Sequence, residues 1–225
     1  MTVGIARRVV RPLFSATELK VLAADFDRTS FVQAGSGWAG PGLAEYAGEV
    51  FRAALDMGEQ VATPHRVENG ALLGGARFLR LDPGHPGLDE QTRPAMAAAC
   101  RRLGAAEFFG GMRDAARELT DCVLPRYGYE RGYFLAYRPG DYLRPHDDRS
   151  TGDRVNVQMP VTVGGYAALR TLGAEGFLEP HPDELGTLRI LGPTIWHDVP
   201  PLITLGGGFR VVFSLRFRRR ARSAQ

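Results

Sequence analysis

The segments YRPGDYLRPHDD (residues 137–148) and GTLRILGPTIWHDVP (residues 186–200) together carry two histidines and a carboxylate at a spacing that suits a metal site. The first segment contains His146 and Asp148, and the second contains His197 about fifty residues later. Side chains two positions apart on a strand point to the same side, so His146 and Asp148 can face one ion. Two imidazoles and one carboxylate, with further coordination positions left open, are typical ligands of non-haem Fe(II). We therefore predict that these three residues bind iron.

A His-x-Asp pair is weak evidence by itself, because the chain contains a second one at residues 181–183. That copy, His-Pro-Asp, lies only sixteen residues before His197 and follows Glu179-Pro180, a composition typical of a surface loop. We interpret it as structural or solvent-exposed. Taken alone, His146 and His197 are also better explained as polar residues at the edge of a sheet. Only an ordered combination with a third segment favours the metal.

The third segment is GGGFRVVFSLR (residues 206–216), which predicts a strand. Arg210 and Arg216 share one face of that strand, together with Val212 and Ser214. An unpaired guanidinium is costly to bury, so an arginine inside a barrel implies an anionic partner, and its planar fork fits a carboxylate. We expect Arg210 to point inward. For Arg216 an outward position beside the basic C-terminal tail stays open.

In this order, the motifs resemble the Fe(II)- and 2-oxoglutarate-dependent dioxygenases, particularly their prolyl-hydroxylase-like branch. The resemblance covers roughly residues 132–217, and the residues that carry it are Tyr137-x-Pro-Gly with Tyr142, His146-x-Asp148, Arg154, His197-x-Val199-x-Pro201 and Gly208-x-Arg210. Two departures put the substrate class in doubt more than the cosubstrate. The interval between His197 and Arg210 is longer than in the prolyl hydroxylases, and the sequence GGYA (residues 164–167) replaces their Gly-Gly-acid-Thr segment.

The resemblance implies that Fe(II) binds to His146, Asp148 and His197, which are then the catalytic centre. It also implies that 2-oxoglutarate is held through its distal carboxylate by Arg210, with Arg216 as the alternative. Tyr137 matches a position near the cosubstrate and the substrate, although a packed aromatic explains it equally well. The implied reaction uses O2 to decarboxylate 2-oxoglutarate to succinate and to hydroxylate a substrate C–H. Because Asp148 is present, the resemblance does not extend to the related halogenases, which lack this carboxylate.

Hydrophobic periodicity predicts an α+β fold in which N-terminal helices support a double-stranded β-helix, a jelly-roll or cupin-like barrel. We expect one domain over residues 1–225, with support elements in 1–125, the barrel core in 126–218 and a basic tail in 219–225. Helices are predicted at 15–28, at 43–57 and, split near residues 103–104, at 89–122, with a hairpin at Glu68-Asn69-Gly70. The predicted core strands are residues 132–137, 142–145, 155–163, 185–191, 194–197 and 209–217.

Composition excludes several broad classes. The net charge of +3 and the isoelectric point near 9.1 arise mostly from the arginines of residues 216–222, so no body-wide surface for nucleic acid is expected. No apolar run has the length of a signal peptide core or a membrane span. Cys100 and Cys122 lack metal-binding spacing, and we interpret them as free thiols in a reducing compartment. We expect a cytoplasmic protein without membrane partners.

Four residues are candidates for substrate contact, although packing or solvent exposure explains each of them slightly better when it is taken singly. Arg144, Asn156 and Gln158 have the strand parity to face the pocket, and Trp38 lies in a Gly-rich segment, residues 35–42, that is the best candidate for a mobile loop. We predict hydroxylation of a small molecule, either an amino acid or a natural-product intermediate, free or bound to a carrier protein. A peptidyl hydroxylase is the alternative. A nucleic-acid demethylase and a non-catalytic cupin-like metal-binding domain are less favoured.

Overall fold

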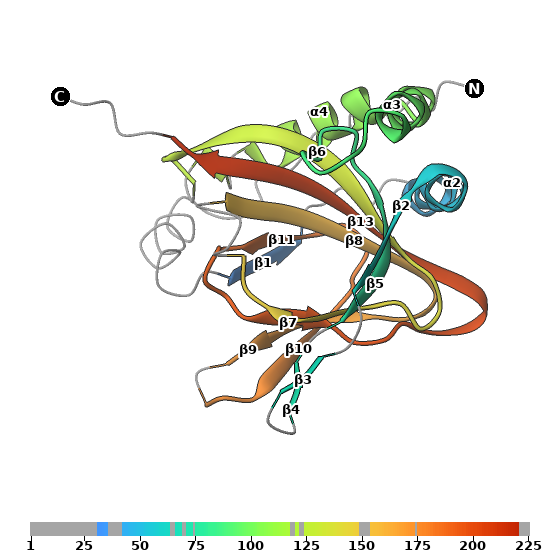
Figure 1. The fold of residues 1–225 in the computed structure, drawn as a ribbon. Helices are drawn as coiled ribbons and strands as arrows, with labels where there is room; N and C mark the ends of the chain where they lie inside the picture. The colour runs from blue at the N-terminus through green and yellow to red at the C-terminus, as the bar shows by residue number, and fades with distance from the viewer. Residues whose placement is uncertain are drawn as a thin grey trace.

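The computed structural model describes residues 31–35, 42–63, 66–68, 71–73, 75–117, 120–121, 124–148, 154–173 and 175–220. Its main feature is a curled antiparallel sheet with three helices packed on one side (Figure 1). The helices are α2 (Leu43–Met57), α3 (Thr92–Arg102) and α4 (Ala105–Ala115). The strands are β1 (Phe31–Gly35), β2 (Glu59–Thr63), β3 (Arg66–Glu68), β4 (Ala71–Leu73), β5 (Ala76–Leu81), β6 (Tyr127–Tyr137), β7 (Tyr142–His146), β8 (Arg154–Tyr166), β9 (Ala168–Leu172), β10 (Leu178–Pro182), β11 (Thr187–Leu191), β12 (His197–Val199) and β13 (Ile203–Arg219).

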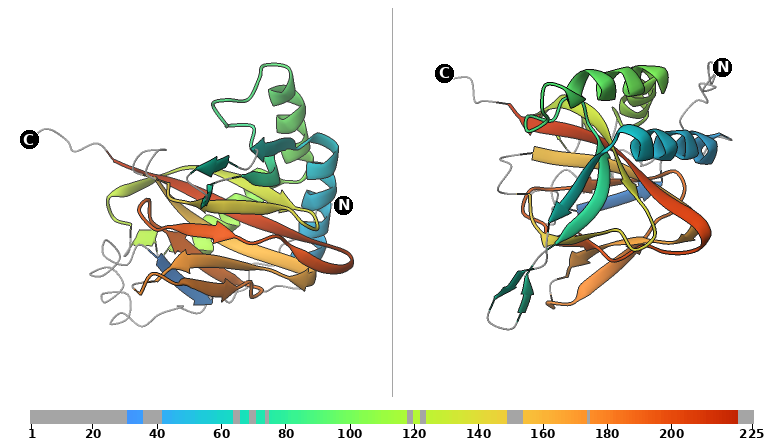
Figure 2. Two further views of the ribbon diagram at one scale, coloured as in Figure 1. Left: turned by 60° about the horizontal axis from the view of Figure 1, so that its bottom comes forward. Right: turned by 45° about the vertical axis from the view of Figure 1, so that its right-hand side comes forward.

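The order of the strands shows how the sheet folds over on itself. One layer, which we term the major layer, has the order β11-β8-β13-β6, and the other, the minor layer, has the order β7-β12-β9-β10. Strand β5 joins them, because its last residues pair with β6 and its first residues pair with β7. The chain therefore passes from one layer to the other between β6 and β7, and the two layers face each other across a common interior (Figure 2). This is the predicted double-stranded β-helix.

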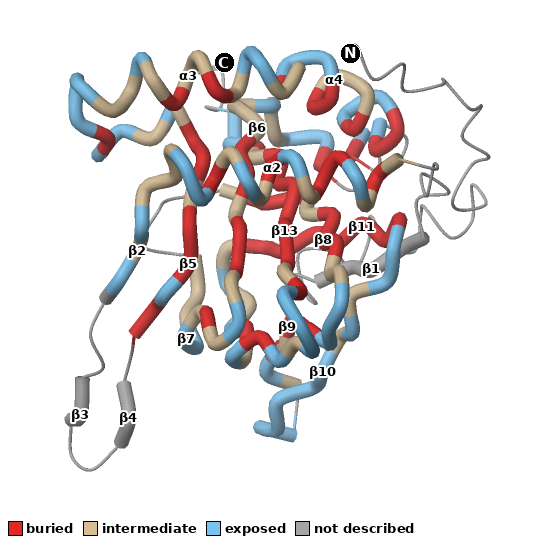
Figure 3. Tube along the Cα trace, turned by 90° about the vertical axis from the view of Figure 1, so that its right-hand side faces the viewer, coloured by how far each residue is buried: buried red, intermediate tan, exposed pale blue. Residues whose placement is uncertain are grey.

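The three helices cover the outer face of the major layer. Helix α2 buries one stripe at helical spacing, formed by Leu43, Tyr46, Ala47, Val50 and Ala54. The residues of β8 and β13 with odd numbers, such as Met159 and Phe213, point toward the helices and join the same core. Both long strands are thus buried on this face by helices and on the other face by the barrel interior, as the red tube of β8 and β13 shows (Figure 3).

One glycine controls how closely α4 packs on the sheet. A Cβ atom added at Gly132 in β6 would lie 2.3 Å from Cγ of Phe109, which is buried in α4. Carbon atoms cannot approach so closely, so the ring of Phe109 requires a glycine beneath it. The absence of a side chain here lets the aromatic ring lie directly on the backbone of β6.

The interior between the two layers combines a small apolar cluster with buried polar groups. The apolar cluster comprises Ala76, Phe78, Tyr137, Ala167, Leu169, Leu191, Val199, Leu202 and Val212. Arg189, His197, Arg210 and Ser214 are buried with it, each at most 4% exposed. A barrel filled only for stability would contain few such groups, because a buried polar group is costly unless it is paired. The interior between the two layers is therefore the candidate location of the functional site.

Most of the predicted elements that fall on described residues are present, and the differences concern short strands. Helix α2 spans the predicted residues, and the break between α3 and α4 lies at residues 103–104 as predicted. We expected residues 61–63 to pair with a strand in residues 72–81, and β2 does pair with β5; a further short antiparallel pair, β3 with β4, lies between them in the chain. Strands β1, β9 and β10 were not predicted, and the strand predicted at residues 194–197 is instead β12, which begins at His197. The expected helix at residues 15–28 lies outside the described residues.

Strand β10 escaped prediction because it contains Pro180 and Pro182, which are rare in strands. The structure explains why prolines are tolerated there: β10 is an edge strand and pairs only with β9. None of the helices in the described part of the chain is long and apolar enough to span a membrane.

Candidate metal centre

The two predicted histidine ligands lie side by side. His146 ends β7 and His197 begins β12, and the antiparallel pairing of these strands sets the two residues directly opposite each other. Their ring centroids are 4.3 Å apart. Nδ1 of His146 lies 2.9 Å from the carbonyl oxygen of Arg144, and Nδ1 of His197 lies 3.0 Å from that of Ile195. In each ring Nδ1–H donates to the backbone, which leaves Nε2 with a lone pair that can bind a metal.

Asp148 lies just beyond the end of β7, on the same side as the imidazoles. Its Oδ1 is 3.9 Å from Nε2 of His146, and its Oδ2 accepts a hydrogen bond of 3.0 Å from Nδ2 of Asn156. Neighbouring ligands of one ion that are each about 2.1 Å from the metal lie about 3 Å apart. In agreement with this difference, no group of three His, Cys, Asp or Glu side chains in the described residues is already closed to metal-binding distances. Asp148 and His146 would have to approach each other by about 1 Å to bind one ion.

Burial favours the metal-binding form of His197. The side chain is 4% exposed, and burial together with the neighbouring His146 holds the pKa of His197 below its usual value. The ring is therefore neutral at pH 7, which is the form that coordinates a metal.

Groups from the major layer hold the carboxylate of Asp148 in place. Asn156 projects from β8, and its Oδ1 accepts hydrogen bonds from the hydroxyl of Tyr133 (3.2 Å) and from Nε of Arg216 (3.3 Å). A terminal nitrogen of Arg216 also donates to the hydroxyl of Tyr133 at 3.2 Å. Since every partner of Asn156 fixes the orientation of its amide, the amide nitrogen is directed at Asp148. Asn156 thus connects the predicted metal ligands of the minor layer to the major layer.

Arg210 points into the barrel, as predicted from its strand parity, and is 1% exposed. Its fork is engaged by Asp183, with Nε 2.6 Å from Oδ2 and a terminal nitrogen 3.2 Å from Oδ1. Asp183 also accepts from Arg189 at 2.7 Å and from the hydroxyl of Thr162 at 2.8 Å. Burial alone would raise the pKa of Asp183, but the charges of Arg210 and Arg189 outweigh burial and hold this pKa below its usual value.

This finding corrects one part of the sequence interpretation. The segment His181-Pro182-Asp183 was taken as structural or solvent-exposed, with the composition of a surface loop. It is structural, because the Asp183 side chain is 1% exposed and is the anionic partner of Arg210 inside the barrel. The exposed residues of β10 gave no sign that the carboxylate following them turns inward.

Tyr137 and Ser214 complete the interior around Arg210. The guanidinium of Arg210 lies over the ring of Tyr137, 5.0 Å from its centroid, and burial raises the pKa of Tyr137 to about 12. Ser214, four residues after Arg210 on the same face of β13, has a buried hydroxyl without a hydrogen-bond partner among the described residues. A buried hydroxyl in this condition is expected to have a partner that the polypeptide does not supply.

The chain matches no protein-family model and no curated protein sequence, but its structure is similar to solved ones. A Pseudomonas putida prolyl-4-hydroxylase is 21% identical with a TM-score of 0.55, over 90% of this chain and 99% of that one. An oxidoreductase of the 2OG-Fe(II) oxygenase family from Burkholderia pseudomallei is 12% identical with a TM-score of 0.51, over 90% and 91%. The non-haem α-ketoglutarate-dependent epimerase SnoN from nogalamycin biosynthesis is 13% identical with a TM-score of 0.57, over 91% and 84%.

This chain has the 2-oxoglutarate–Fe(II) oxygenase fold. Two imidazoles, each with Nε2 released by a backbone contact at Nδ1, and one oriented carboxylate form a donor set that suits Fe(II). The chemistry of the donors therefore fits iron.

The interior also has groups that fit a dicarboxylate such as 2-oxoglutarate. Asp183 engages two of the five N–H donors of Arg210, so the guanidinium has donors beyond those used by Asp183. The hydroxyl of Ser214 lies on the same strand face and has no partner in the described chain. A carboxylate bound here would share Arg210 with Asp183. The assignment of the cosubstrate to Arg210, with Tyr137 beside it, stays a prediction.

The remaining predicted residues of the oxygenase fold occupy different surroundings. Asn156 and Gln158 are on the interior face of β8, but Asn156 contacts Asp148, so its position is one of support for a ligand. Arg144 is exposed on β7, and Trp38 lies outside the described residues. Sequence reasoning missed Asp183 and Tyr133. The inward parity of Tyr133, two and four residues before Leu135 and Tyr137, was the available signal for Tyr133.

Proposed function

We propose that the protein is an Fe(II)- and 2-oxoglutarate-dependent oxygenase that hydroxylates an unactivated C–H of a small molecule. One observation carries the proposal: His146 and His197 face each other with both Nε2 atoms released, and the oriented Asp148 carboxylate lies beside them. The fold supports the same conclusion. The activity and the ligand roles are inferred for this chain from these contacts together with the fold.

In this proposal iron, when bound, supplies the oxidative chemistry that couples decarboxylation of 2-oxoglutarate to oxidation of the substrate. The backbone contacts at Nδ1 fix the tautomer and the ring orientation of His146 and His197. Asn156 holds the second oxygen of Asp148, which keeps Oδ1 turned toward the imidazoles. Held in this way, the three residues would bind the ion and leave coordination positions for other ligands.

Arg210 and Ser214 are proposed to bind the distal carboxylate of 2-oxoglutarate. Both lie on the interior face of β13, and Arg210 is already held rigidly by Asp183. A guanidinium fixed in this way needs little reorganisation when it receives a second carboxylate. The deep, water-poor position of Arg210 strengthens its attraction for that carboxylate.

We favour a small-molecule substrate. It would be an amino acid or a natural-product intermediate, either free or bound to a carrier protein. The similarity to SnoN, an enzyme of nogalamycin biosynthesis, supports it. The similarity to a prolyl-4-hydroxylase supports the alternative, hydroxylation of a peptidyl residue. Assays with free amino acids and with short peptides of the same residues separate the two, because only a peptidyl hydroxylase requires the flanking peptide bonds.

Succinate formation from 2-oxoglutarate tests the proposed function. The wild-type protein is expected to form succinate in the presence of Fe(II) and O2, and the rate should increase with a suitable substrate. D148N removes the charge of the predicted ligand while keeping its shape, and it should abolish turnover. D114N is the matched control, because Asp114 is exposed in α4, on the outer side of the major layer, and it should retain turnover. The proposal is refuted if wild type forms no succinate, or if the two variants behave alike.

A further inference from the structure

Arg216 is a half-buried cation that makes its hydrogen bonds to neutral groups in the described part of the chain. Its hydrogen bonds go to two neutral groups, Oδ1 of Asn156 and the hydroxyl of Tyr133, and the described residues place no carboxylate within ion-pair distance. The guanidinium also lies over the ring of Tyr133, 5.0 Å from its centroid. This differs from Arg210 and Arg189, which are both paired with Asp183. A cation removed from water and left unpaired raises the free energy of the protein unless an anion joins it.

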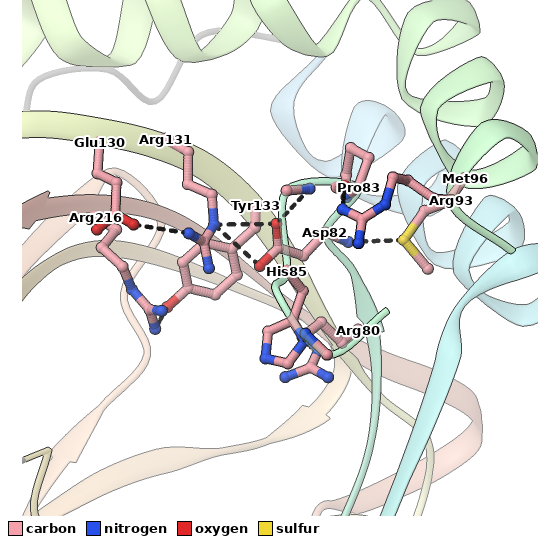
Figure 4. A network of polar contacts seen from close by, with 12 residues as sticks. Arg80, Asp82, Pro83, His85, Arg93, Met96, Glu130, Arg131, Tyr133 and Arg216 are labelled. Carbon is pink, nitrogen blue, oxygen red and sulfur yellow. Dashed lines mark hydrogen bonds and ion pairs between the residues drawn. The ribbon is translucent and has the colours of Figure 1, made fainter. Parts of the chain in front are cut away.

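A second guanidinium lies directly across the ladder. Arg131 in β6 pairs in register with Arg216 in β13, so the two like charges project from the same face. Arg131 contacts Asp82 through Nε at 3.1 Å and Glu130 through one terminal nitrogen at 2.9 Å, while its other terminal nitrogen is buried without a hydrogen-bond partner in the described chain. Figure 4 shows Arg131, Tyr133 and Arg216 together, with Asp82 and Glu130 beside Arg131.

The charge balance of this cluster indicates what it lacks. Glu130 also lies 3.5 Å from Nε of Arg154. Asp148 also attracts Arg216, but its charge is assigned to the metal as a predicted ligand. With Asp148 set aside, the three arginines Arg131, Arg154 and Arg216 share two carboxylates, Asp82 and Glu130, which leaves a net charge of +1. One carboxylate group would neutralise it, whereas a doubly charged phosphate would leave an excess of negative charge.

The position of the cluster points to the substrate and not to the cosubstrate. Arg216 contacts Asn156, which contacts the predicted ligand Asp148, so it lies beside the metal centre. Arg210, the proposed partner of 2-oxoglutarate, is six residues earlier on the same strand, about 20 Å away along an extended chain. Two residues beyond Arg216, Arg218 is exposed to solvent. Along β13, Arg216 therefore lies between the proposed cosubstrate residue Arg210 and the solvent-exposed end of the strand.

We propose that Arg216, with the unpartnered terminal nitrogen of Arg131, binds a carboxylate group of the primary substrate beside the metal centre. The assignment of the bound molecule as the substrate rests on the proposed oxygenase function. The anion site itself rests only on the contacts of Arg216 and Arg131. A planar guanidinium binds a carboxylate through two parallel hydrogen bonds, which fixes the orientation of the molecule as well as holding it.

Saturation-transfer difference NMR tests the site without requiring turnover. The Zn(II)- and 2-oxoglutarate-loaded protein is titrated with the standard L-amino acids, with small aliphatic monocarboxylic acids, with the primary amide of each compound, and with inorganic phosphate. We expect carboxylates to bind and their amides to bind at least tenfold more weakly. R216M should weaken the binding of the best carboxylate at least tenfold. R216K, which keeps the charge but not the planar fork, should give an intermediate loss.

R218M is the matched control, because Arg218 lies on the same strand and is exposed; it should bind carboxylates as wild type does. The proposal is overturned if no carboxylate binds, if amides or phosphate bind as well as carboxylates, or if R216M binds like wild type. If R216M has a lower thermal midpoint than wild type, the binding of R216K is compared with wild type in its place. If Arg216-dependent binding is present but Fe(II) supports no succinate formation, the anion site stands and the oxygenase proposal fails.

Discussion

Asn156 is the residue on which the orientation of the predicted carboxylate ligand depends. It was predicted as a substrate contact, but its amide nitrogen donates to Asp148, and its oxygen accepts from Tyr133 and Arg216. Both ends of the amide are therefore engaged, and the side chain cannot rotate without losing hydrogen bonds. Support of this kind typically contributes about tenfold to a hundredfold to metal affinity.

N156L is expected to weaken metal binding by about tenfold to a hundredfold, because the shape is nearly kept while the hydrogen bond to Asp148 is lost. Y133F removes only the hydroxyl that donates to Asn156, so its effect should be smaller. Titration of each metal-free protein with Mn(II), followed by electron paramagnetic resonance of the free ion, measures the affinities. Equal affinities for N156L and wild type would show that Asp148 needs no support from β8.

Asp183 is the second residue with a large expected effect. D183N leaves Arg210 and Arg189 buried without their carboxylate, and loss of one partner of a buried ion pair typically costs about 3–5 kcal/mol. D198N is the matched control. Asp198 is equally buried, but its partner Arg170 is about one-third exposed, so water can solvate the released cation and the loss should be smaller. Urea unfolding at pH 7, followed by circular dichroism, gives the free energies of unfolding.

Asp183 should also make the stability of the protein depend on pH. The pKa of Asp183 is lower in the folded protein than in the unfolded chain, so the unfolded state binds the proton first as the pH falls. The stabilisation is complete above about pH 4 and is lost as the pH decreases through the folded-state value. The difference in unfolding free energy between wild type and D183N should therefore shrink below pH 4. A difference independent of pH from 7 to 2.5 would contradict this role.

Among the elements, the long, strongly patterned ones were predictable and the short edge strands were not. Helix α2 has an apolar stripe over its whole length, and β8 and β13 are apolar runs buried on both faces, so periodicity identified them. Strand β10 contains two prolines and is mostly exposed, so its composition resembles a loop. Because β10 was not recognised, the inward turn of Asp183 and its pairing with Arg210, 27 positions later, could not be foreseen.

The candidate site was predictable only where it depends on local sequence. Strand parity gave the shared direction of His146 and Asp148 and the inward position of Arg210, because parity is a local property. The contact of Asn156 with Asp148, and the pairing of Arg131 with Arg216, depend on which strands become neighbours. Neighbour relations of distant strands are set by the whole sheet, and no single segment of sequence contains them.

The packing of α4 on β6 predicts opposite effects of two glycine substitutions on stability. G132A should destabilise the protein by about 1–3 kcal/mol, because the new methyl group would overlap the ring of Phe109. G110A is the matched control in α4 itself. A Cβ atom at Gly110 meets nothing within 4 Å, so this change should stabilise the helix by about 0.5–1 kcal/mol. Thermal unfolding of the two variants, compared with wild type, should show shifts of opposite sign.

For the molecule as a whole, the candidate metal centre lies between two layers that β5 joins within the sheet. The three predicted ligands come from β7, the residues just after it and β12 in the minor layer, and Asn156 connects them to β8 in the major layer. A ligand that binds only the folded state stabilises it, by about 2.7 kcal/mol at a concentration one hundred times its dissociation constant. Metal binding should therefore raise the midpoint of global unfolding.

Differential scanning calorimetry with and without Mn(II) and 2-oxoglutarate measures this effect. Wild type should show an increase in Tm that grows with metal concentration, and H197A should show almost none, because one ligand is missing. N156L should show a smaller increase than wild type at the same concentration. An equal increase in H197A and wild type would place the metal elsewhere on the molecule.

The pairing of Arg210 with Asp183 also has a consequence for how this protein can diverge from its relatives. Loss of Asp183 would strand both Arg210 and Arg189 in the barrel, whereas loss of Arg210 would leave Asp183 paired with Arg189. A lineage that gave up the proposed role of Arg210 could therefore replace Arg210 first and keep the other two charges matched. The unequal cost of these single substitutions restricts the order in which the three residues can change.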